Sequence, residues 1–232
     1  MEETRAYEEL RVGFTAAVSH ELRTPLARLL ALLESASLPG ADSDALLAQA
    51  REEVQEMSEL VDDVLFLSEL ESGREVVALG STPALPVLEE VRGRLADSAE
   101  RADVAIRIDA APEVELPLRR RMLQIVAENL GENSIRYAGP GATLTLSASA
   151  GLLEATDDGR GLDPDELSRV FERFYRGDRA RASRGTGLGL AIVKHVVVAA
   201  GGEVEATGGP GHGFTVRCRF RSAPGSASSA TL

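Results

Sequence analysis

Two long amphipathic segments at the start of the chain restrict the folds that it can adopt. Over residues 4–37, apolar side chains recur at spacings of three and four, which predicts one long helix. The proline- and glycine-containing stretch at 38–43 interrupts the pattern, and a second helix capped by Asp42 or Ser43 is expected to run to about Ser72. Two long helices joined by a short loop predict an antiparallel hairpin.

The apolar stripes of the two predicted helices indicate how the hairpin is stabilised. The stripe of the first helix consists of Phe14, Val18, Leu22, Leu26, Leu29 and Leu33. The stripe of the second consists of Leu46 or Leu47, Ala50, Val54, Met57, Val61, Val64 and Ser68. Even when these stripes face each other, the outer seams stay partly apolar, and so thin a hairpin buries too little surface to be stable alone. We therefore expect two copies to form a four-helix bundle, which makes the protein a homodimer.

The composition narrows the range of partners. The formal net charge of -12 disfavours nucleic acid as a partner, because phosphate backbones repel an acidic chain. The single cysteine, Cys218, permits no intramolecular disulfide, which fits a reducing compartment. No apolar run approaches the roughly 20 residues that span a bilayer, and the acidic N-terminus does not resemble a signal peptide. We expect a cytoplasmic piece that would reach a membrane only through a segment upstream of Met1.

The pattern changes at about residue 74, so that residues 1–74 and 75–221 are predicted to be separate domains. In the second domain, helices are expected over 83–101, 117–137 and 187–200. Strands are expected over 76–79, 104–109, 142–149, 152–156, 203–207 and 214–220. This order predicts an α+β sandwich, a mixed sheet with helices on one face. The tail at 222–232 is rich in Ser, Ala and Gly and is predicted to be disordered.

His20 lies in the sequence SHELRTPL, off the apolar stripe, and is expected to face outward from the bundle. Glu21 offers a carboxylate that can accept the imidazole proton and leave the other ring nitrogen as a nucleophile. Thr24 lies one turn further on the same face and is suited to orient a water. Pro25 removes a helical hydrogen bond at a cost of about 3 kcal/mol, and a bend beside a reactive histidine would explain its presence.

Glycines at 185, 187 and 189 precede an apolar helix in the sequence RGTGLGLAIV. Backbone N–H groups at such a helix start are suited to bind a phosphate chain. The motif is not a P-loop, because no Lys-Ser or Lys-Thr pair follows the glycines, and the Arg-rich stretch before it does not fit a dinucleotide-binding fold.

A carboxylate followed by two glycines ends one predicted strand, in the sequence TDDGRGLD. Asp157 can accept a hydrogen bond from an exocyclic amine such as that of adenine. Gly159 and Gly161 would let a flat base approach the backbone.

Two amides share one face of a predicted helix in the sequence ENLGENSIRY. Asn129 and Asn133 are four residues apart, and their oxygens are hard ligands suited to Mg²⁺ together with phosphate oxygens. Arg136 and Tyr137 follow and would line a nucleotide site.

Three aromatic residues occur close together in a chain that is poor in them. Phe171, Phe174 and Tyr175 lie in the polar sequence VFERFYRGD. They either pin this segment to the sheet or form a mobile cover for a ligand.

In their order and spacing, these motifs resemble the sensor histidine kinases of two-component signalling. SHELRTPL is similar to the H box, NLGEN to the N box, DDGRG to the G1 box, FERFYR to the F box and GTGLGLA to the G2 box. GGPGHGFTV at 208–216 is a weaker match to a final glycine box. The resemblance extends from about Glu8 to Phe220. It implies a dimerisation and histidine-phosphotransfer hairpin followed by an ATP-binding α+β sandwich of the GHKL ATPase type.

The resemblance also implies roles for individual residues. His20 would be the phospho-acceptor, Glu21 its base, and Thr24 a residue of the phosphatase activity on the partner, which would be a response regulator that receives the phosphate on an aspartate. Asn133 and Asn129 would hold Mg²⁺, and residues 163–184 would form a lid over ATP. The nucleotide-binding residues would be Asn129, Asn133, Arg136, Tyr137, Asp157, Gly159, Gly161, Phe171, Phe174, Arg184, Gly185, Thr186, Gly187, Leu188 and Gly189.

Four positions depart from the family pattern. Gly131 stands where leucine is common, Ser134 where alanine is common, Asp158 where asparagine is usual, and Arg136 where lysine is common. Chaperones, gyrases, mismatch-repair ATPases and anti-sigma serine kinases share the ATP-binding fold but lack a histidine-bearing hairpin. A catalytically weak ATP-binding scaffold, which regulates a partner through dimer conformation, is the remaining alternative.

Overall fold

The computed structural model describes residues 2–72, 80–177 and 185–221, with side chains described from Ala17 onward. The expected strand at 76–79 and the tail at 222–232 lie outside these ranges. No helix in the described ranges is both long enough and apolar enough to cross a bilayer.

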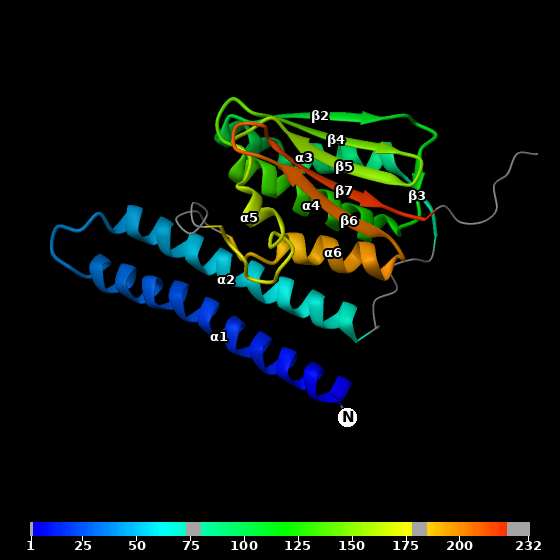
Figure 1. The fold of residues 1–232 in the computed structure, drawn as a ribbon. Helices are drawn as coiled ribbons and strands as arrows, with labels where there is room; N and C mark the ends of the chain where they lie inside the picture. The colour runs from blue at the N-terminus through cyan, green and yellow to red at the C-terminus, as the bar shows by residue number, and fades with distance from the viewer. Residues whose placement is uncertain (1, 73–79, 178–184, 222–232) are drawn as a thin grey trace, which may run out of the picture.

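The first domain is the predicted helical hairpin. Helix α1 covers Glu2–Ala36 and helix α2 covers Ser43–Glu71, and the two run antiparallel (Figure 1). The side chain of Asp42 caps α2 by accepting a hydrogen bond from the backbone N–H of Ala45 at 3.1 Å. Pro25 lies inside α1 without ending it.

The hairpin helices carry exposed apolar side chains as well as buried or half-buried ones. Each predicted stripe combined residues of both kinds. Side chains of α2 that pack inside the hairpin or against the second domain include Ala50, Glu53, Leu60, Leu67 and Leu70, which are buried. The prediction that Leu26, Leu33, Val54 and Val61 face the partner helix is wrong, since all four are exposed. The side chain of Phe14 lies outside the described residues. A helix in a bundle has more than one neighbour, so apolar positions spaced by three and four can belong to different contacts.

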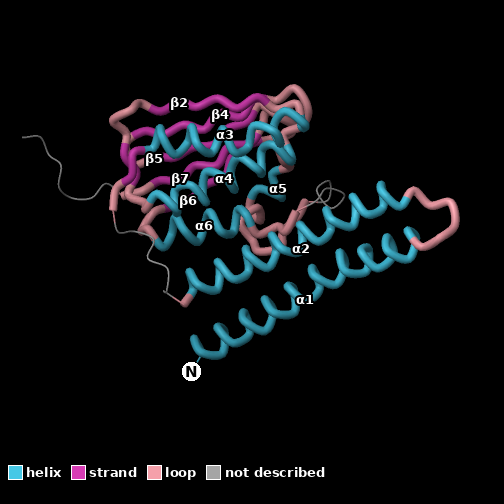
Figure 2. The backbone as a smooth tube through the Cα atoms, turned by 180° about the vertical axis from the view of Figure 1, so that it is seen from behind, coloured by secondary structure: helices cyan, strands magenta, loops and turns pink. Residues whose placement is uncertain are grey.

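The second domain confirms the predicted α+β sandwich. Its elements are β1 (Thr82–Pro83), α3 (Ala84–Ala102), β2 (Ala105–Ala110), β3 (Glu115–Leu116), α4 (Arg120–Tyr137), β4 (Thr143–Ser149), β5 (Leu152–Asp157), α5 (Pro164–Leu167), α6 (Gly189–Ala199), β6 (Glu203–Gly208) and β7 (Phe214–Arg219). The sheet has the order β2-β4-β5-β7-β6, in which β2 and β4 are parallel and the other pairs antiparallel. Helices α3, α4 and α6 cover one face (Figure 2). The short β1–β3 pair and α5 were not predicted.

The close approach of α3 to α4 explains Gly131. The helix α4 is buried along this side, and a Cβ atom at position 131 would overlap the Cδ1 atom of Leu95 in α3. Glycine therefore serves helix packing here, at some cost to the helical propensity of α4.

The hairpin packs against the second domain through α2. Leu67 and Leu70 belong to the same buried cluster as the residues of α6, and α2 lies alongside α6 in both ribbon views (Figures 1 and 2). In both views α1 lies on the far side of α2 from the sheet. This arrangement makes α2 one wall of the space between the domains.

Candidate functional site

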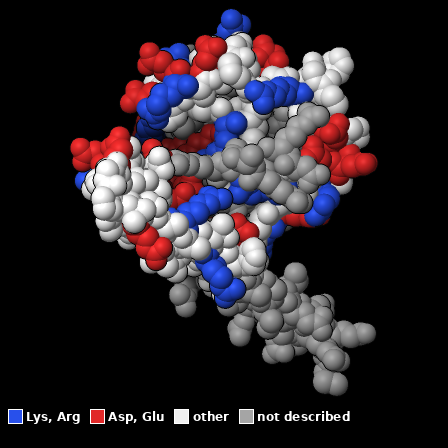
Figure 3. Space-filling model, turned by 90° about the vertical axis from the view of Figure 1, so that its left-hand side faces the viewer, with Lys and Arg blue, Asp and Glu red and all other residues white. Residues whose placement is uncertain are grey.

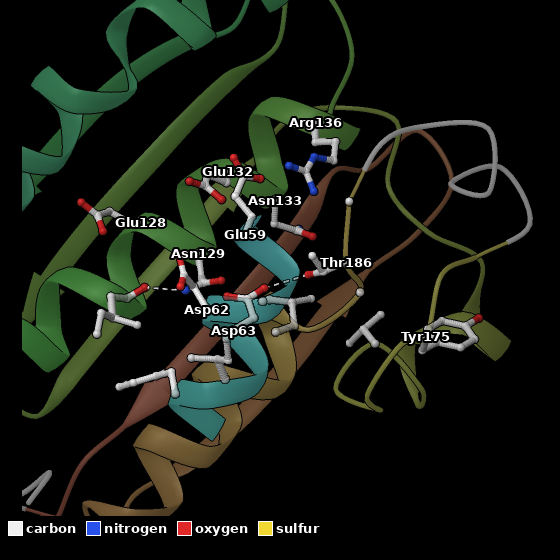
Figure 4. A pocket seen from close by; sticks show the side chains of 18 of the residues that line it. Glu59, Asp62, Asp63, Glu128, Asn129, Glu132, Asn133, Arg136, Tyr175 and Thr186 are labelled. Carbon is white, nitrogen blue, oxygen red and sulfur yellow. Dashed lines mark hydrogen bonds between the residues drawn. The ribbon is translucent and has the colours of Figure 1, made fainter. Parts of the chain in front are cut away.

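A cavity of about 540 Å³ lies between α2 and the second domain. Figure 4 shows side chains from α2, from α4 and from the glycine-rich loop before α6 around it. The predicted site residues that line it are Asn129, Asn133, Arg136, Tyr137, Gly185, Thr186, Gly187 and Gly189. Seen from one end of the molecule, acidic and basic side chains intermingle around a hollow (Figure 3).

A smaller cavity of about 200 Å³ adjoins the first. It is lined by Asp157 and Gly161, and it shares Asn133, Arg136, Tyr137 and Tyr175 with the larger cavity. The two cavities therefore form one elongated site, with Asp157 at one end and the glycine-rich loop at the other.

Asp157 is held rigidly at its end of the site. It is only 3% exposed, its Oδ2 accepts a hydrogen bond from Ser134 Oγ at 3.0 Å, and its Oδ1 accepts one from the N–H of Gly159 at 3.0 Å. Burial raises the pKa of Asp157, although the hydrogen bonds from Gly159 and Ser134 oppose the shift. Each carboxylate oxygen has capacity for a further hydrogen bond, so the group can accept one from an exocyclic amine.

The two glycines after Asp157 are required by the backbone around them. A Cβ at Gly159 would overlap the carbonyl oxygen of Ala138, and one at Gly161, whose φ is +66°, would overlap the carbonyl oxygen of Gly209. Gly161 lines the smaller cavity, whereas Gly159 lines neither. These glycines therefore serve the close packing of three loops, which in turn fixes Asp157.

Asp158 points away from the site. Its Oδ1 accepts a hydrogen bond from the backbone N–H of Thr143 at 2.6 Å, at the start of β4, and it lines neither cavity. The carboxylate that departs from the family pattern therefore secures a strand end and places no charge in the site.

The two asparagines of α4 fit the role of cation ligands. The Nδ2 of Asn129 donates to the carbonyl of Ile125 at 2.9 Å, which leaves its Oδ1 facing Gly189. A Cβ atom on Gly189 would lie only 2.6 Å from that oxygen, so the glycine keeps this corner open. Asn133 lies one turn further and lines both cavities (Figure 4). Amide oxygens are hard ligands of the kind that Mg²⁺ accepts, so these two side chains are the candidate ligands of the site.

The glycine-rich loop is ordered by hydrogen bonds of Thr186. Its Oγ1 donates to Asp63 Oδ2 at 2.9 Å and accepts from the N–H of Leu188 at 3.2 Å. Gly185 and Gly187 adopt positive φ, and a side chain at Gly185 would overlap the guanidinium of Arg136. Leu188 is buried and lines neither cavity. Arg184 lies outside the described residues.

The aromatic residues before this loop divide into two groups. Phe171 and Phe174 are half-buried, pack against the core and line neither cavity, whereas Tyr175 lines both. The N–H of Phe174 donates to the carbonyl of Gly187 at 2.9 Å, which ties the segment to the glycine-rich loop. The two phenylalanines are thus placed as anchors and Tyr175 as a contact to a ligand.

His20 is exposed on α1, away from both cavities. Its side chain is 76% accessible, and its Nδ1 lies 3.7 Å from Glu21 Oε1, which is too long for a hydrogen bond but close enough for an ion pair. Glu21 and Thr24 also line neither cavity. The structure therefore places most of the predicted residues of the second domain around the two adjoining cavities and keeps His20, Glu21 and Thr24 outside them.

Six carboxylates in the larger cavity were not predicted from the sequence. They are Glu59, Asp62, Asp63 and Glu69 of α2 and Glu128 and Glu132 of α4. Burial raises the pKa of Asp63 to about 6 and also raises that of Glu132. Their only signal in the sequence is an acidic spacing on a helix, which is also typical of a solvated helix face.

Two family models match the chain. The model described as the His Kinase A (phospho-acceptor) domain matches residues 10–73. The model described as histidine kinase-, DNA gyrase B- and HSP90-like ATPase matches residues 119–224.

Curated proteins that resemble this chain include two sensor proteins. The sensor-like histidine kinase SenX3 of Mycobacterium tuberculosis is 34% identical over 218 residues, which cover 90% of this chain and 53% of SenX3. The phosphate regulon sensor protein PhoR of Pseudomonas aeruginosa is 34% identical over 228 residues, which cover 92% of this chain and 50% of PhoR. The chain thus spans about half the length of these relatives.

Solved structures similar to this chain include two histidine kinases. The histidine kinase AdeS of Acinetobacter baumannii has a TM-score of 0.69 and 25% identity, and the match covers 88% of this chain and 98% of that one. Histidine kinase ThkA, solved in complex with the response regulator protein TrrA, has a TM-score of 0.72 at 18% identity, with 96% of this chain and 66% of that one covered. The second likeness supports the fold alone.

Proposed function

The chain belongs to the sensor histidine kinases of two-component signalling, and from this membership we propose that it transfers the γ-phosphate of ATP to His20. The observation that carries the proposal is the elongated site, in which a buried carboxylate at one end and a glycine-rich loop at the other match the two ends of a nucleotide.

ATP would lie along the site with its base in the smaller cavity. Asp157 would accept a hydrogen bond from the exocyclic amine of adenine, beside Tyr137 and Tyr175. The phosphates would extend toward Thr186 and the N-terminus of α6, where free N–H groups and the helix dipole favour negative charge. The oxygens of Asn129 and Asn133 would hold Mg²⁺, which supplies charge neutralisation of the phosphates when bound.

The transfer would form a bond between phosphorus and Nε2 of His20. Glu21 lies on the Nδ1 side of the ring, so it would take the Nδ1 proton and leave Nε2 as the nucleophile. The bond between the γ-phosphorus and the bridging oxygen breaks, and ADP leaves with that oxygen. Since His20 lines neither cavity, a change in the arrangement of the domains would bring the phosphates to His20 of the same or of the other copy.

The phosphate would then pass to an aspartate of a response regulator. ThkA is solved in complex with such a partner, and the exposed surface of α1 around His20 is accessible for a similar contact. Thr24, one turn from His20, would orient a water that hydrolyses the aspartyl phosphate of the regulator to free aspartate and inorganic phosphate. Two copies of the hairpin would form the four-helix bundle on which these steps take place.

The scaffold alternative gains no support from the positions that suggested it. Gly131 accommodates Leu95 and Asp158 secures the start of β4, so both departures have structural roles outside the site.

The kinase proposal is tested by incubating the protein with γ-labelled ATP and Mg²⁺. We expect a protein-bound label that is stable in base and lost in acid, as a phosphoramidate bond requires. His20→Gln should abolish the label, and His212→Gln, which changes an exposed histidine of the second domain, should retain it. A label that survives in His20→Gln would show that another residue accepts the phosphate.

A further inference from the structure

Helix α2 is tied to the ATP-binding domain at two points. The hydroxyl of Thr186 donates to Asp63 at 2.9 Å (Figure 4), and two turns further along α2, Glu71 forms an ion pair with Arg173. Between them, Leu67 and Leu70 are buried in the cluster that includes α6. One face of α2 is therefore docked on the domain along the edge of the larger cavity.

The hydrogen bond from Thr186 to Asp63 uses the hydroxyl hydrogen that Thr186 could otherwise donate to a phosphate. A threonine hydroxyl has a single hydrogen to donate. Thr186 gives it to Asp63, while its oxygen accepts from the N–H of Leu188. As long as α2 is docked, Thr186 cannot donate to a phosphate oxygen in the glycine-rich loop.

The docked helix also makes the cavity acidic. Among the described residues that line it, the carboxylates are Glu59, Asp62, Asp63, Glu69, Glu128 and Glu132, and the guanidiniums are Arg121 and Arg136. Four of the six carboxylates come from α2, so this helix supplies most of the negative charge. A triphosphate that enters a partly buried site meets repulsion from these groups, which bulk water does not fully screen.

We propose that Asp63 is an autoinhibitory latch: it occupies Thr186 and places a carboxylate at the phosphate end of the site, so that docking of α2 and binding of ATP compete. The inference rests on the proposed function, because only the proposed orientation of ATP places the phosphates at the glycine-rich loop. By linkage, ATP that binds there drives α2 off the domain by the same free energy with which α2 weakens ATP binding. Release of α2 is also what the transfer needs, since α1 with His20 lies beyond α2 in this arrangement (Figures 1 and 2).

The electrostatics of Asp63 suit a latch that opens. The pKa of this carboxyl is raised to about 6, mainly by burial and also by the charges of Glu59 and Asp62, while the hydrogen bond from Thr186 and the charge of Arg136 oppose the shift. Glu132 of α4 faces the same group. Since the pKa is higher when α2 is docked than the ordinary 3.8, docking is most stable below that value and weakens as the pH rises through about 6. At neutral pH the ionised carboxylate of Asp63 is therefore partly removed from water while α2 is docked. Release of α2 returns this charge to water, which makes release easier.

The latch is tested by titrating Mg²⁺ and the non-hydrolysable ATP analogue AMPPNP into wild type and three variants by calorimetry. Asp63→Ala removes the acceptor and should tighten binding about three- to tenfold, as expected for loss of one competing hydrogen bond. Asp63→Asn keeps an acceptor for Thr186 and removes only the charge, so it should tighten binding less than Asp63→Ala does. Asp62→Ala removes a neighbouring charge from the same wall and should change the affinity less than about twofold.

Equal tightening by Asp63→Ala and Asp63→Asn would overturn the latch, because repulsion alone would then explain the effect. No tightening by Asp63→Ala relative to Asp62→Ala would overturn it as well. A second measurement needs no change at Asp63: spin labels at Ser58 of α2 and Val198 of α6, both exposed, should move apart when AMPPNP binds, and an unchanged distance contradicts the proposal. If the wild type neither binds AMPPNP nor becomes labelled, the kinase proposal itself fails.

Discussion

Adjacent carboxylates at the end of β5 differ completely in what they contact. Asp157 is buried and accepts hydrogen bonds from Ser134 and Gly159, and it faces the smaller cavity. Asp158 holds the N–H of Thr143 outside the site. Asp157 is the last residue of β5 and Asp158 follows the strand, so the two side chains leave the backbone in different directions and meet different partners.

The pair offers a matched test at the residue scale. We expect Asp157→Asn to weaken ATP binding about tenfold or more, because a hydrogen bond to a charged acceptor contributes about 1.5–3 kcal/mol. Asp158→Asn should leave the affinity within about twofold and lower the thermal stability slightly instead. Calorimetric titration and thermal unfolding of both variants separate the two roles, and equal loss of affinity in both would contradict this assignment.

At the scale of single elements, the packing of α3 on α4 depends on a missing side chain. Gly131 lies where α4 meets Leu95, whereas a Cβ atom at Gly93 of α3 would have open space around it, with no heavy atom of another element within 4 Å. Both glycines lie inside helices, so their intrinsic cost to the helix is similar.

Alanine at these two positions should therefore have opposite effects. Gly131→Ala forces buried Leu95 to move, and we expect it to lower the free energy of unfolding by about 1 kcal/mol or more, even after the gain in helix propensity. Gly93→Ala should raise it by up to about 1 kcal/mol. Urea denaturation of the two variants measures both values, and a stabilised Gly131→Ala variant would mean that Leu95 relaxes without cost.

The elements themselves were well predicted by periodicity and end signals. The bounds of α2, α3 and the β4–β5 hairpin agree with the sequence to within a few residues, because capping residues, glycines and changes of period act locally. The faces of α1 and α2 were predicted less well. Leu26 and Val54 were expected inside the hairpin and are exposed, since spacing alone does not say which of two apolar seams meets which neighbour.

At the scale of the whole molecule, the exposed apolar surface is concentrated on one domain. Of the nine large apolar side chains that are exposed in the described ranges, all except Val198 belong to the hairpin and its loop. Contiguous exposed apolar side chains are typical of an interface, so their distribution supports the proposed pairing of two hairpins.

A charged residue on the exposed apolar surface of the hairpin should weaken the proposed dimer. Leu30 is 54% exposed on α1, and Leu30→Asp would place two carboxylates in the bundle of a dimer, which we expect to weaken dimerisation about a hundredfold or more. Val198→Asp changes the exposed apolar residue of α6 and should leave the dimer intact. Sedimentation equilibrium over a range of concentrations distinguishes the outcomes, and a dimeric Leu30→Asp variant would place the interface elsewhere.

The sequence by itself determined the two-domain order, most of the elements and the glycine and asparagine motifs from which ten residues line the elongated site. The glycine and asparagine motifs are local, and each sits on a turn or helix face whose geometry follows from a few neighbouring residues. Only the tertiary structure decided that α2 forms a wall of the site, that Asp63 holds Thr186, and that His20 lies outside both cavities. The physical reason is that acidic residues on a helix look the same whether they face water or another domain, and the choice depends on packing between segments that are far apart in the sequence.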